Sequence, residues 1–198
     1  MLTLYHCPGT RSGSAVWLLE ELAVPYELEI VPVGVRGDPP ESYRAIHPHK
    51  KVPAIVHDGV AVTERAAIFA YLCDAFPAAG LAPPIGDPRR GPYLSWLVYN
   101  DAVFDPVLAA KFMGWEYDKR GVSFGAFEDM VSKLETTLTA TPYLTGEAFT
   151  AADLLIAGGL NFAVRMQKAI PETPALAGFL DRTTGRDAAR RAFEKARA

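Results

Sequence analysis

Every strand pattern in this chain lies before residue 63, and the segments after it have only helical periodicity. Short apolar or alternating runs predict strands over 2–5, 26–31, 53–57 and 60–62. The remaining two thirds of the chain offer no strand signal of any strength. This order predicts an α/β N-terminal domain followed by an all-α C-terminal domain.

The predicted strands form one mixed sheet. Between the first two, apolar residues recur at helical spacing, at Ala15, Leu18, Leu19 and Leu22. The pattern is that of a βαβ unit, whose strands run parallel with a right-handed crossover. Asp58-Gly59 is a two-residue turn signal, so 53–57 and 60–62 form an antiparallel hairpin. After a short helix before the hairpin, a longer one follows over about 64–76, giving four strands with helices on their faces.

Residues 82–92 contain four prolines and two glycines, a composition typical of a linker. The predicted domains are therefore 1–80, a linker over 81–91, and an all-helical domain over 92–198. Helical periodicity in that domain predicts helices over 92–112, 121–139, 151–168 and 185–196.

The clearest local signature in the second half is Phe149-Thr150-Ala151-Ala152-Asp153-Leu154. Thr150 is placed to cap the N–H of Asp153 while the Asp153 side chain reaches back, and Phe149 is placed to pack on Leu154. The residues that follow, through Ala163, are apolar nearly all round, which predicts a central buried helix.

Composition excludes several classes of function. The net charge of −3 gives no electrostatic case for nucleic acid, and no apolar run reaches the roughly 18 residues of a transmembrane helix. The N-terminus lacks the pattern of a signal peptide, so we expect a cytoplasmic protein that does not engage a membrane. Two cysteines, Cys7 and Cys73, allow neither a disulfide framework nor a cysteine-based zinc site, and the four histidines are dispersed, so no metal is expected.

A proline opens the third predicted strand, although proline is tolerated in strands only at an edge or first position. With a cis Val52-Pro53 bond the chain turns sharply and leaves the Val52 backbone groups unpaired, ready to hold an extended peptide as an added strand would. Glu64 and Arg65 then open a helix whose positive end suits a carboxylate. Together these features predict a site for a small zwitterionic peptide.

The element order, the proline before the third strand, the Pro-rich linker and the Thr-x-x-Asp box together resemble the cytosolic glutathione transferases of bacterial type. The resemblance spans nearly the whole chain. It implies a thioredoxin-like N-terminal domain that binds glutathione as co-substrate and a helical domain that supplies most of the pocket for an electrophile. It also implies a homodimer that conjugates glutathione to small hydrophobic electrophiles in detoxification.

The site residues follow from two matched elements. His47-Pro48-His49-Lys50-Lys51-Val52-Pro53 is similar to the family's Asn-Pro-x-Gly-Lys-Val-Pro, and Thr63-Glu64-Arg65 is similar to its Thr-Glu-Ser. By that resemblance Val52 pairs with the cysteinyl part of glutathione, Lys51 meets the glycyl carboxylate, and Glu64 and Arg65 hold the γ-glutamyl end. Arg65 departs from the family's small hydroxyl residue, with a longer reach and a different geometry.

One hydroxyl is sufficient to activate glutathione. Its thiol has a pKa of about 8.5, so about 3% is thiolate at pH 7, and a hydrogen bond to the sulfur lowers that pKa by about one to two units. Thr10 sits where serine-type members of the family place this hydroxyl, and we favour it. Tyr5 and Cys7 are the alternatives, and Arg11 and Ser12 could add donors near the sulfur.

Two other functions stay open. Cys7-Pro8 is similar to the cysteine-type transferases and glutaredoxins, in which a thiolate forms a mixed disulfide with glutathione, so a monothiol reductase using Cys7 is the first alternative. A buried strand-end cysteine would give the same sequence. The second alternative is a non-catalytic binding protein that has kept the fold.

Overall fold

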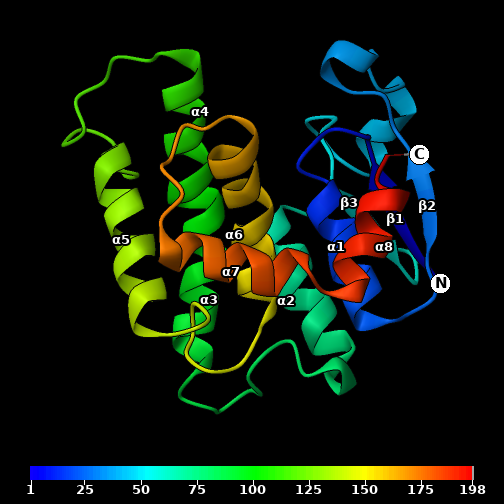
Figure 1. Cartoon of the computed structure of the whole chain (residues 1–198). Helices are drawn as coiled ribbons and strands as arrows, with labels where there is room; N and C mark the ends of the chain where they lie inside the picture. Colours follow the sequence, from blue (N-terminus) through cyan, green and yellow to red (C-terminus); the bar gives the residue numbers. More distant parts are fainter. Residues whose placement is uncertain (198) are drawn as a thin grey trace. The chain divides into compact units, whose positions relative to one another are not determined.

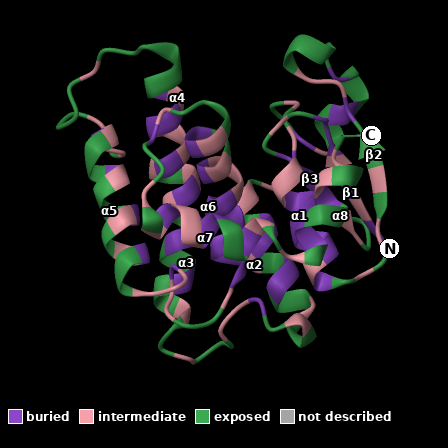
Figure 2. Ribbon diagram, in the orientation of Figure 1, coloured by how far each residue is buried: buried purple, intermediate pink, exposed green. Residues whose placement is uncertain are grey.

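The computed structural model describes residues 1–197 and resolves them into two compact units (Figure 1). Unit 1 comprises Met1–Ala79 together with the residues from Arg186 onward, and unit 2 comprises Gly80–Gly185. Each unit has a buried interior of its own, drawn in purple in Figure 2.

Unit 1 contains a four-stranded mixed sheet in the order β2-β1-β3-β4. Its strands are β1 (Leu2–His6), β2 (Glu27–Ile30), β3 (Ala54–His57) and β4 (Val60–Thr63). β1 runs parallel to β2 and antiparallel to β3, and β3 pairs antiparallel with β4. The βαβ unit and the hairpin at Asp58-Gly59 are therefore confirmed.

The helices of unit 1 are α1 (Gly13–Leu22), α2 (Arg65–Ala75), α8 (Asp187–Lys195) and the short 3-10 turns η1 (Gly34–Arg36), η2 (Glu41–Ala45) and η3 (Pro77–Ala79). α1 packs against both α2 and α8. The sheet and α1 bury complementary apolar residues: alternate residues of β1 are buried, and Ala15 to Leu19 on α1 have almost no exposed surface.

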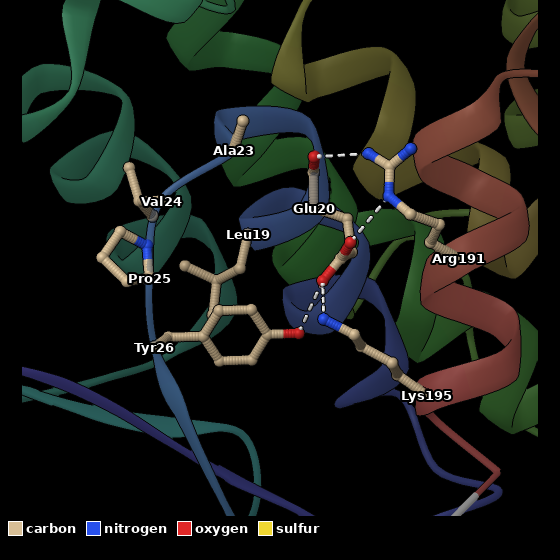
Figure 3. A pocket seen from close by; sticks show the side chains of 8 residues that line it. All are labelled: Leu19, Glu20, Ala23, Val24, Pro25, Tyr26, Arg191 and Lys195. Atoms are coloured by element: carbon tan, nitrogen blue, oxygen red, sulfur yellow. Dashed lines mark hydrogen bonds and ion pairs between the residues drawn. The ribbon is translucent and has the colours of Figure 1, made fainter.

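The end of the chain belongs to unit 1, which differs from the expected domain 92–198. α8 packs on α1 through ion pairs: Arg191 and Lys195 contact Glu20 at 2.9 and 2.6 Å (Figure 3). Arg186, just before α8, contacts Glu21 at 2.6 Å. The carboxylates of Glu20 and Glu21 are both buried, so they need these cationic partners. Such pairing between the first and last helices leaves no periodic signal in a sequence.

Unit 2 is helical, and no strand occurs in the part of it that is described. Its helices are α3 (Arg90–Tyr99), α4 (Asp105–Met113), α5 (Phe127–Ala140), α6 (Ala151–Asn161) and α7 (Pro174–Thr184). Two π-helical segments, η4 (Asn100–Phe104) and η5 (Phe162–Met166), follow α3 and α6. η4 lies just before Pro106, which has no N–H to donate inside a helix and so favours a wider turn there.

The predicted capping box is present at α6. Thr150 accepts from the backbone of Asp153, and the Asp153 carboxylate accepts from the Thr150 N–H at 2.8 Å. Its other oxygen accepts from the Leu144 N–H at 2.7 Å, which ties the preceding loop to the helix. α6 is buried nearly all round, as its composition predicts (Figure 2).

α7 is absent from the sequence prediction. Gly178, Thr183 and Thr184 lower its helix propensity, which hides the periodicity. The sequence nevertheless contains a helix N-terminus signal, Thr173 followed by Pro174, since proline suits the first helical position. In the structure the Thr173 hydroxyl caps the helix by accepting from the Leu176 N–H at 3.4 Å.

Candidate functional site

Three segments singled out in the sequence adjoin the sheet of unit 1 at the same end of its strands. Tyr5 near the end of β1 pairs with Ala54 at the start of β3, and Ala54 pairs with Thr63 at the end of β4. The loop after β1, the Val52-Pro53 turn before β3 and the start of α2 after β4 therefore converge at one end of the sheet. This convergence makes a single candidate site from residues far apart in sequence.

The Val52-Pro53 turn has the conformation that the sequence prediction required. The peptide bond is cis, and none of the hydrogen bonds among residues 1–197 uses the Val52 backbone. Two contacts fix the position of the turn. The Tyr43 hydroxyl donates to the Lys51 carbonyl at 2.9 Å, and the Val52 side chain packs on the apolar cluster of Val31, Tyr43 and Ala54. Lys51 itself is exposed. The backbone of Val52 is thus positioned and available to pair with a peptide.

Glu64 has an unusual backbone conformation, with φ of 66° and ψ of 124°. Its carbonyl accepts the first hydrogen bond of α2 from Ile68 at 2.9 Å, and its exposed side chain makes no capping bond. A non-glycine residue in this region costs about 1–3 kcal/mol, a cost typical of functional sites. Arg65, the first residue of α2, is half-buried.

His47 belongs to the same neighbourhood. It is buried, and burial lowers the pKa of its imidazole while the nearby Glu64 carboxylate acts in the opposite direction. Its Nδ1 accepts from the His49 N–H at 3.2 Å. His47 therefore shapes the loop before Lys51, a role that the sequence comparison with an asparagine position did not reveal.

The loop after β1 is organised around two hydroxyls. Thr10 Oγ1 lies 2.7 Å from the Cys7 carbonyl and 2.7 Å from Ser12 Oγ. Ser12 Oγ accepts from the Cys7 N–H at 3.1 Å and lies 2.7 Å from Nδ1 of His6. Thr10 is only partly buried, whereas Ser12 and His6 have no exposed surface.

Packing and burial distinguish the three residues, Tyr5, Cys7 and Thr10, that were expected to contact the thiol of glutathione. Tyr5 packs against Tyr43, with ring centroids 5.4 Å apart, so its ring is part of the cluster behind the Val52-Pro53 turn. Cys7 has no exposed surface, so its thiol is not presented to a ligand. Thr10 is the candidate whose hydroxyl is both held by the loop and partly open. Arg11 beside it is exposed.

Ser12 does not fit the ligand-binding role expected of it. Its side chain is fully buried, and its hydroxyl contacts His6, Cys7 and Thr10 from the inner side. The buried Ser12 hydroxyl instead fixes the position of the Thr10 hydroxyl, which it contacts at 2.7 Å. Sequence reasoning missed His6 altogether, because a single histidine at a strand end gives no signal until its partners are in place.

A pocket of about 450 Å³ lies elsewhere in unit 1 (Figure 3). It is lined by the C-terminal part of α1, the chain through Tyr26, and α8. Its charged groups are paired with one another: Glu20 accepts from Tyr26 at 3.0 Å as well as from Arg191 and Lys195. The pocket lies at the opposite end of α1 from Thr10 and has a structural role.

No group of residues among 1–197 has the composition and spacing of a metal site. Within the same residues no helix is long and apolar enough to cross a membrane. The candidate site offers a ligand the hydroxyl of Thr10, the carboxylate of Glu64 and the open backbone of Val52.

Comparison with known proteins agrees with this arrangement. "Glutathione S-transferase 3" of Schizosaccharomyces pombe is 29% identical over 171 residues, 77% of this chain and 70% of the relative. "Disulfide-bond oxidoreductase YfcG" of Escherichia coli is 26% identical over 212 residues, 99% and 96% of the two chains. A sphingomonad glutathione S-transferase solved in complex with glutathione is 27% identical, with a TM-score of 0.83 over 98% of each chain.

Family sequence profiles match both parts of the chain. The profile of the glutathione S-transferase N-terminal domain matches residues 4–83, and that of the C-terminal domain matches residues 104–187. The first match includes all three segments of the candidate site. With the four-stranded mixed sheet of unit 1 and the helices of unit 2, these matches show that the chain belongs to the glutathione S-transferase family.

Proposed function

We propose that this protein is a glutathione transferase that adds the thiolate of glutathione to small hydrophobic electrophiles. The observation that carries the proposal is the convergence of Thr10, Val52 and Glu64 at one end of the sheet. Glutathione is an extended peptide with a carboxylate at each end, an amine at one end and a thiol between them. The three segments offer a hydroxyl, an open backbone and a carboxylate that suit those groups.

Each segment has a separate task. The N–H and C=O of Val52, before cis-Pro53, pair with the cysteinyl part of glutathione as a neighbouring strand would. The Glu64 carboxylate holds the γ-glutamyl amine, and Arg65 at the start of α2 faces the γ-glutamyl carboxylate. The exposed Lys51 meets the glycyl carboxylate. The charged ends of the peptide are thus matched in sign.

Thr10 supplies the chemistry. A thiol with a pKa of about 8.5 is about 3% ionised at pH 7, and the thiolate is the nucleophile. A hydrogen bond from the Thr10 hydroxyl to the charged sulfur is worth about 1.5–3 kcal/mol, since one partner is ionised. At about 1.4 kcal/mol for each pKa unit, roughly 30 to 80% of the bound thiol is then thiolate at pH 7. Arg11 adds positive charge on the exposed side of the loop.

The resemblance to the family leads us to expect a homodimer that acts in the cytoplasm in detoxification. The test of the activity is turnover by the purified protein with a panel of halogenated aromatics, epoxides and enones. We expect glutathione-dependent turnover of at least one class. Absence of turnover across the panel, combined with tight binding of glutathione, would instead favour a non-catalytic binding protein.

Reduction of disulfides is a second candidate, favoured by the similarity to a protein named as a disulfide-bond oxidoreductase. The full burial of Cys7 argues against a route through its thiol. If reduction occurs, we expect the thiolate of glutathione beside Thr10 to attack the disulfide. Reductase assays on Cys7→Ser and Thr10→Val separate the routes: the first variant should retain activity and the second should lose it.

A further inference from the structure

A continuous chain of hydrogen-bonding groups runs inward from Thr10 to the end of the molecule's last helix. Thr10 Oγ1 lies 2.7 Å from Ser12 Oγ, and Ser12 Oγ lies 2.7 Å from His6 Nδ1. On its other side the imidazole contacts the backbone carbonyl of Ala196, with 3.1 Å between Nε2 and the oxygen. The two middle members, Ser12 and His6, have no exposed surface, so water does not interrupt the chain.

The direction of these bonds follows from counting protons. A carbonyl only accepts, so Nε2 of His6 carries a proton that it donates to Ala196. Burial lowers the pKa of His6, and the positive charge of Arg36 acts in the same direction, so the imidazole is neutral and its Nδ1 is an acceptor. The Ser12 hydroxyl has two acceptors, Nδ1 of His6 at 2.7 Å and the Cys7 carbonyl at 3.3 Å, and its single proton is donated to the nearer one, His6. Ser12 Oγ is left as an acceptor toward Thr10.

Thr10 is thus the donor in its contact with Ser12, and every bond of the chain points from Thr10 toward Ala196. The Thr10 proton has a second acceptor at the same distance, the Cys7 carbonyl at 2.7 Å. Each of these two acceptors also has a donor other than the Thr10 hydroxyl. Ser12 Oγ accepts from the Cys7 N–H, and the Cys7 carbonyl accepts from the Thr10 N–H. While Thr10 donates to Ser12, one lone pair of Thr10 Oγ1 accepts from the Ser12 N–H at 3.3 Å, and the remaining lone pair is the acceptor for a proton from the ligand.

We propose that His6 takes up the thiol proton of bound glutathione through the hydroxyls of Thr10 and Ser12, a relay that rests on the proposed function. The S–H bond of glutathione breaks as its proton binds Thr10 Oγ1. The proton that Thr10 held moves to Ser12 Oγ, and the proton that Ser12 held moves to Nδ1 of His6. No proton is gained or lost, and the products are a thiolate and an imidazolium.

After the transfer the hydrogen bonds that join Thr10, Ser12 and His6 are reversed, the bond from Nε2 to Ala196 keeps its direction, and none of them is lost. The imidazolium donates from Nδ1 to Ser12 and from Nε2 to Ala196, Ser12 donates to Thr10, and Thr10 donates to the thiolate. The charged groups facing His6 fit this cycle. Before glutathione binds, burial lowers the pKa of the imidazole, the Ala196 carbonyl just after α8 acts in the other direction, and Arg36 from η1 adds a smaller lowering effect. A thiolate adds the negative charge that stabilises an imidazolium.

α8 therefore completes the relay. Its end lies against the start of α1, since a Cβ placed on Gly13 would be 3.7 Å from that of Ala196. The ion pairs of Glu20 and Glu21 with α8 and the residue before it keep the Ala196 carbonyl in place. Because His6 acts through two other residues, we regard it as a positioning residue and proton acceptor and not as a group that touches the substrate.

The direct test is nitrogen NMR of the imidazole of His6 in the full-length wild-type protein. Without a ligand we expect a neutral ring protonated at Nε2. At the same pH, glutathione should convert the ring to imidazolium, while S-methylglutathione, which has no thiol proton to give, should leave it neutral. A ring that stays neutral with glutathione would overturn the relay, and so would a ring that both ligands protonate.

A matched pair of variants gives a second readout. His6→Phe keeps an aromatic ring and removes the proton acceptor, whereas His57→Phe removes a histidine of the same unit whose Nδ1 contacts Tyr71 outside the chain of bonds. For His6→Phe we expect the pKa of bound glutathione, read from the ultraviolet absorbance of its thiolate, to rise by at least about one unit. The value of kcat/KM at neutral pH should fall about tenfold or more and recover at high pH, with the KM for glutathione unchanged.

His57→Phe should leave the pH profile as in wild type. A wild-type profile for His6→Phe would overturn the relay, and if that variant does not fold, the NMR measurement on the wild type decides the matter. The outcome for the proposed function is separate. Failure of the wild-type protein to bind glutathione would remove both proposals, whereas binding and turnover with a neutral His6 would remove the relay alone.

Discussion

The imidazole Nε2 of His6 and the carbonyl oxygen of Ala196 lie 3.1 Å apart, although 190 positions separate the two residues in the chain. The first strand and the end of the last helix thus meet beside the loop that carries Thr10. Unit 1 is therefore built from both ends of the chain, and α8 is part of it.

Thr10→Val tests the hydroxyl at the centre of the proposed chemistry. Valine has nearly the shape of threonine but cannot donate to a thiolate, so we expect kcat/KM at pH 7 to fall about 10- to 100-fold, the equivalent of about 1.5–3 kcal/mol. The pKa of bound glutathione should rise by about one to two units. Steady-state kinetics and thiolate absorbance across a pH series measure both effects.

Thr10→Ser is the control for that variant, since it keeps the hydroxyl and its contacts with Cys7 and Ser12. We expect it to retain most of the activity. Full activity in Thr10→Val would show that another group ionises the thiol, and Tyr5 would then become the leading candidate.

Glu64→Gly and Glu64→Ala separate the two properties of this residue. Both remove the carboxylate, so both should abolish measurable glutathione binding by calorimetry. Only glycine relieves the conformation at φ 66°, so Glu64→Gly should be more stable than Glu64→Ala by about 1–2 kcal/mol in urea unfolding. Equal stabilities would mean that the backbone of Glu64 is not strained in solution.

Asp153 should make the protein less stable as the pH rises. Burial raises the pKa of its carboxyl from 3.8 to about 6, so the folded state binds this proton more tightly than the unfolded state. The stabilising contribution is present below the ordinary pKa and is lost as the pH rises through about 6, by about 1.4 kcal/mol for each unit of difference. Urea midpoints of wild type and Asp153→Asn between pH 4 and pH 7 should show the wild type losing stability relative to the variant.

A constant difference between those two proteins over that range would contradict the assignment. Asp118→Asn is the control, because the carboxylate of Asp118 is largely exposed and pairs with the exposed Arg120, so its effect on stability should be small at every pH.

Glu20 should have the opposite pH dependence. Burial alone would raise the pKa of its carboxyl, but the donors Lys195, Arg191 and Tyr26 outweigh that effect and the pKa lies below 4.5. Its contribution to stability is therefore present above its ordinary pKa and is lost as the pH falls through the folded value. Glu20→Gln should cost about 1–3 kcal/mol at neutral pH, and the cost should shrink in acid. A cost that grew in acid would reverse the sign argued here.

Two adjacent glycines of α6 offer a test of the packing in unit 2. A Cβ on Gly159 would lie 2.5 Å from a ring carbon of the fully buried Phe104, whereas a Cβ on Gly158 would meet nothing within 4 Å. We expect Gly159→Ala to destabilise by about 1–3 kcal/mol through overpacking, and Gly158→Ala to stabilise by up to about 1 kcal/mol through helix propensity. Thermal unfolding of the two variants measures the contrast, and a similar shift in both would contradict this packing.

Much of the fold could be predicted from local patterns. Alternation, the Asp58-Gly59 turn and the Thr150-Asp153 box are local signals, and each has its expected structure. α7 was missed because glycine and threonine weaken its periodicity. The place of α8 could not be predicted, since it depends on the buried carboxylates of Glu20 and Glu21 finding cations more than 160 positions away.

The candidate site divides in the same way. Val52 and Pro53 were recognisable because proline is restricted in strands, and the cis bond is present. The strain at Glu64 and the burial of Cys7 are properties of the folded chain, which a sequence pattern does not contain. The sequence predicts Ser12 as a ligand contact, but a serine near a helix start can serve as a cap or as a binding group, and only its surroundings in the fold decide between the two roles.

A crystal structure of the protein soaked with glutathione tests the central claim most directly. We predict that the sulfur lies within about 3.5 Å of Thr10 Oγ1, that the Val52 backbone pairs with the cysteinyl part of the peptide, and that the Glu64 carboxylate contacts the γ-glutamyl amine. The account would be contradicted by a sulfur that contacts Tyr5 or Cys7. It would also be contradicted by glutathione bound away from the end of the sheet where Thr10, Val52 and Glu64 meet.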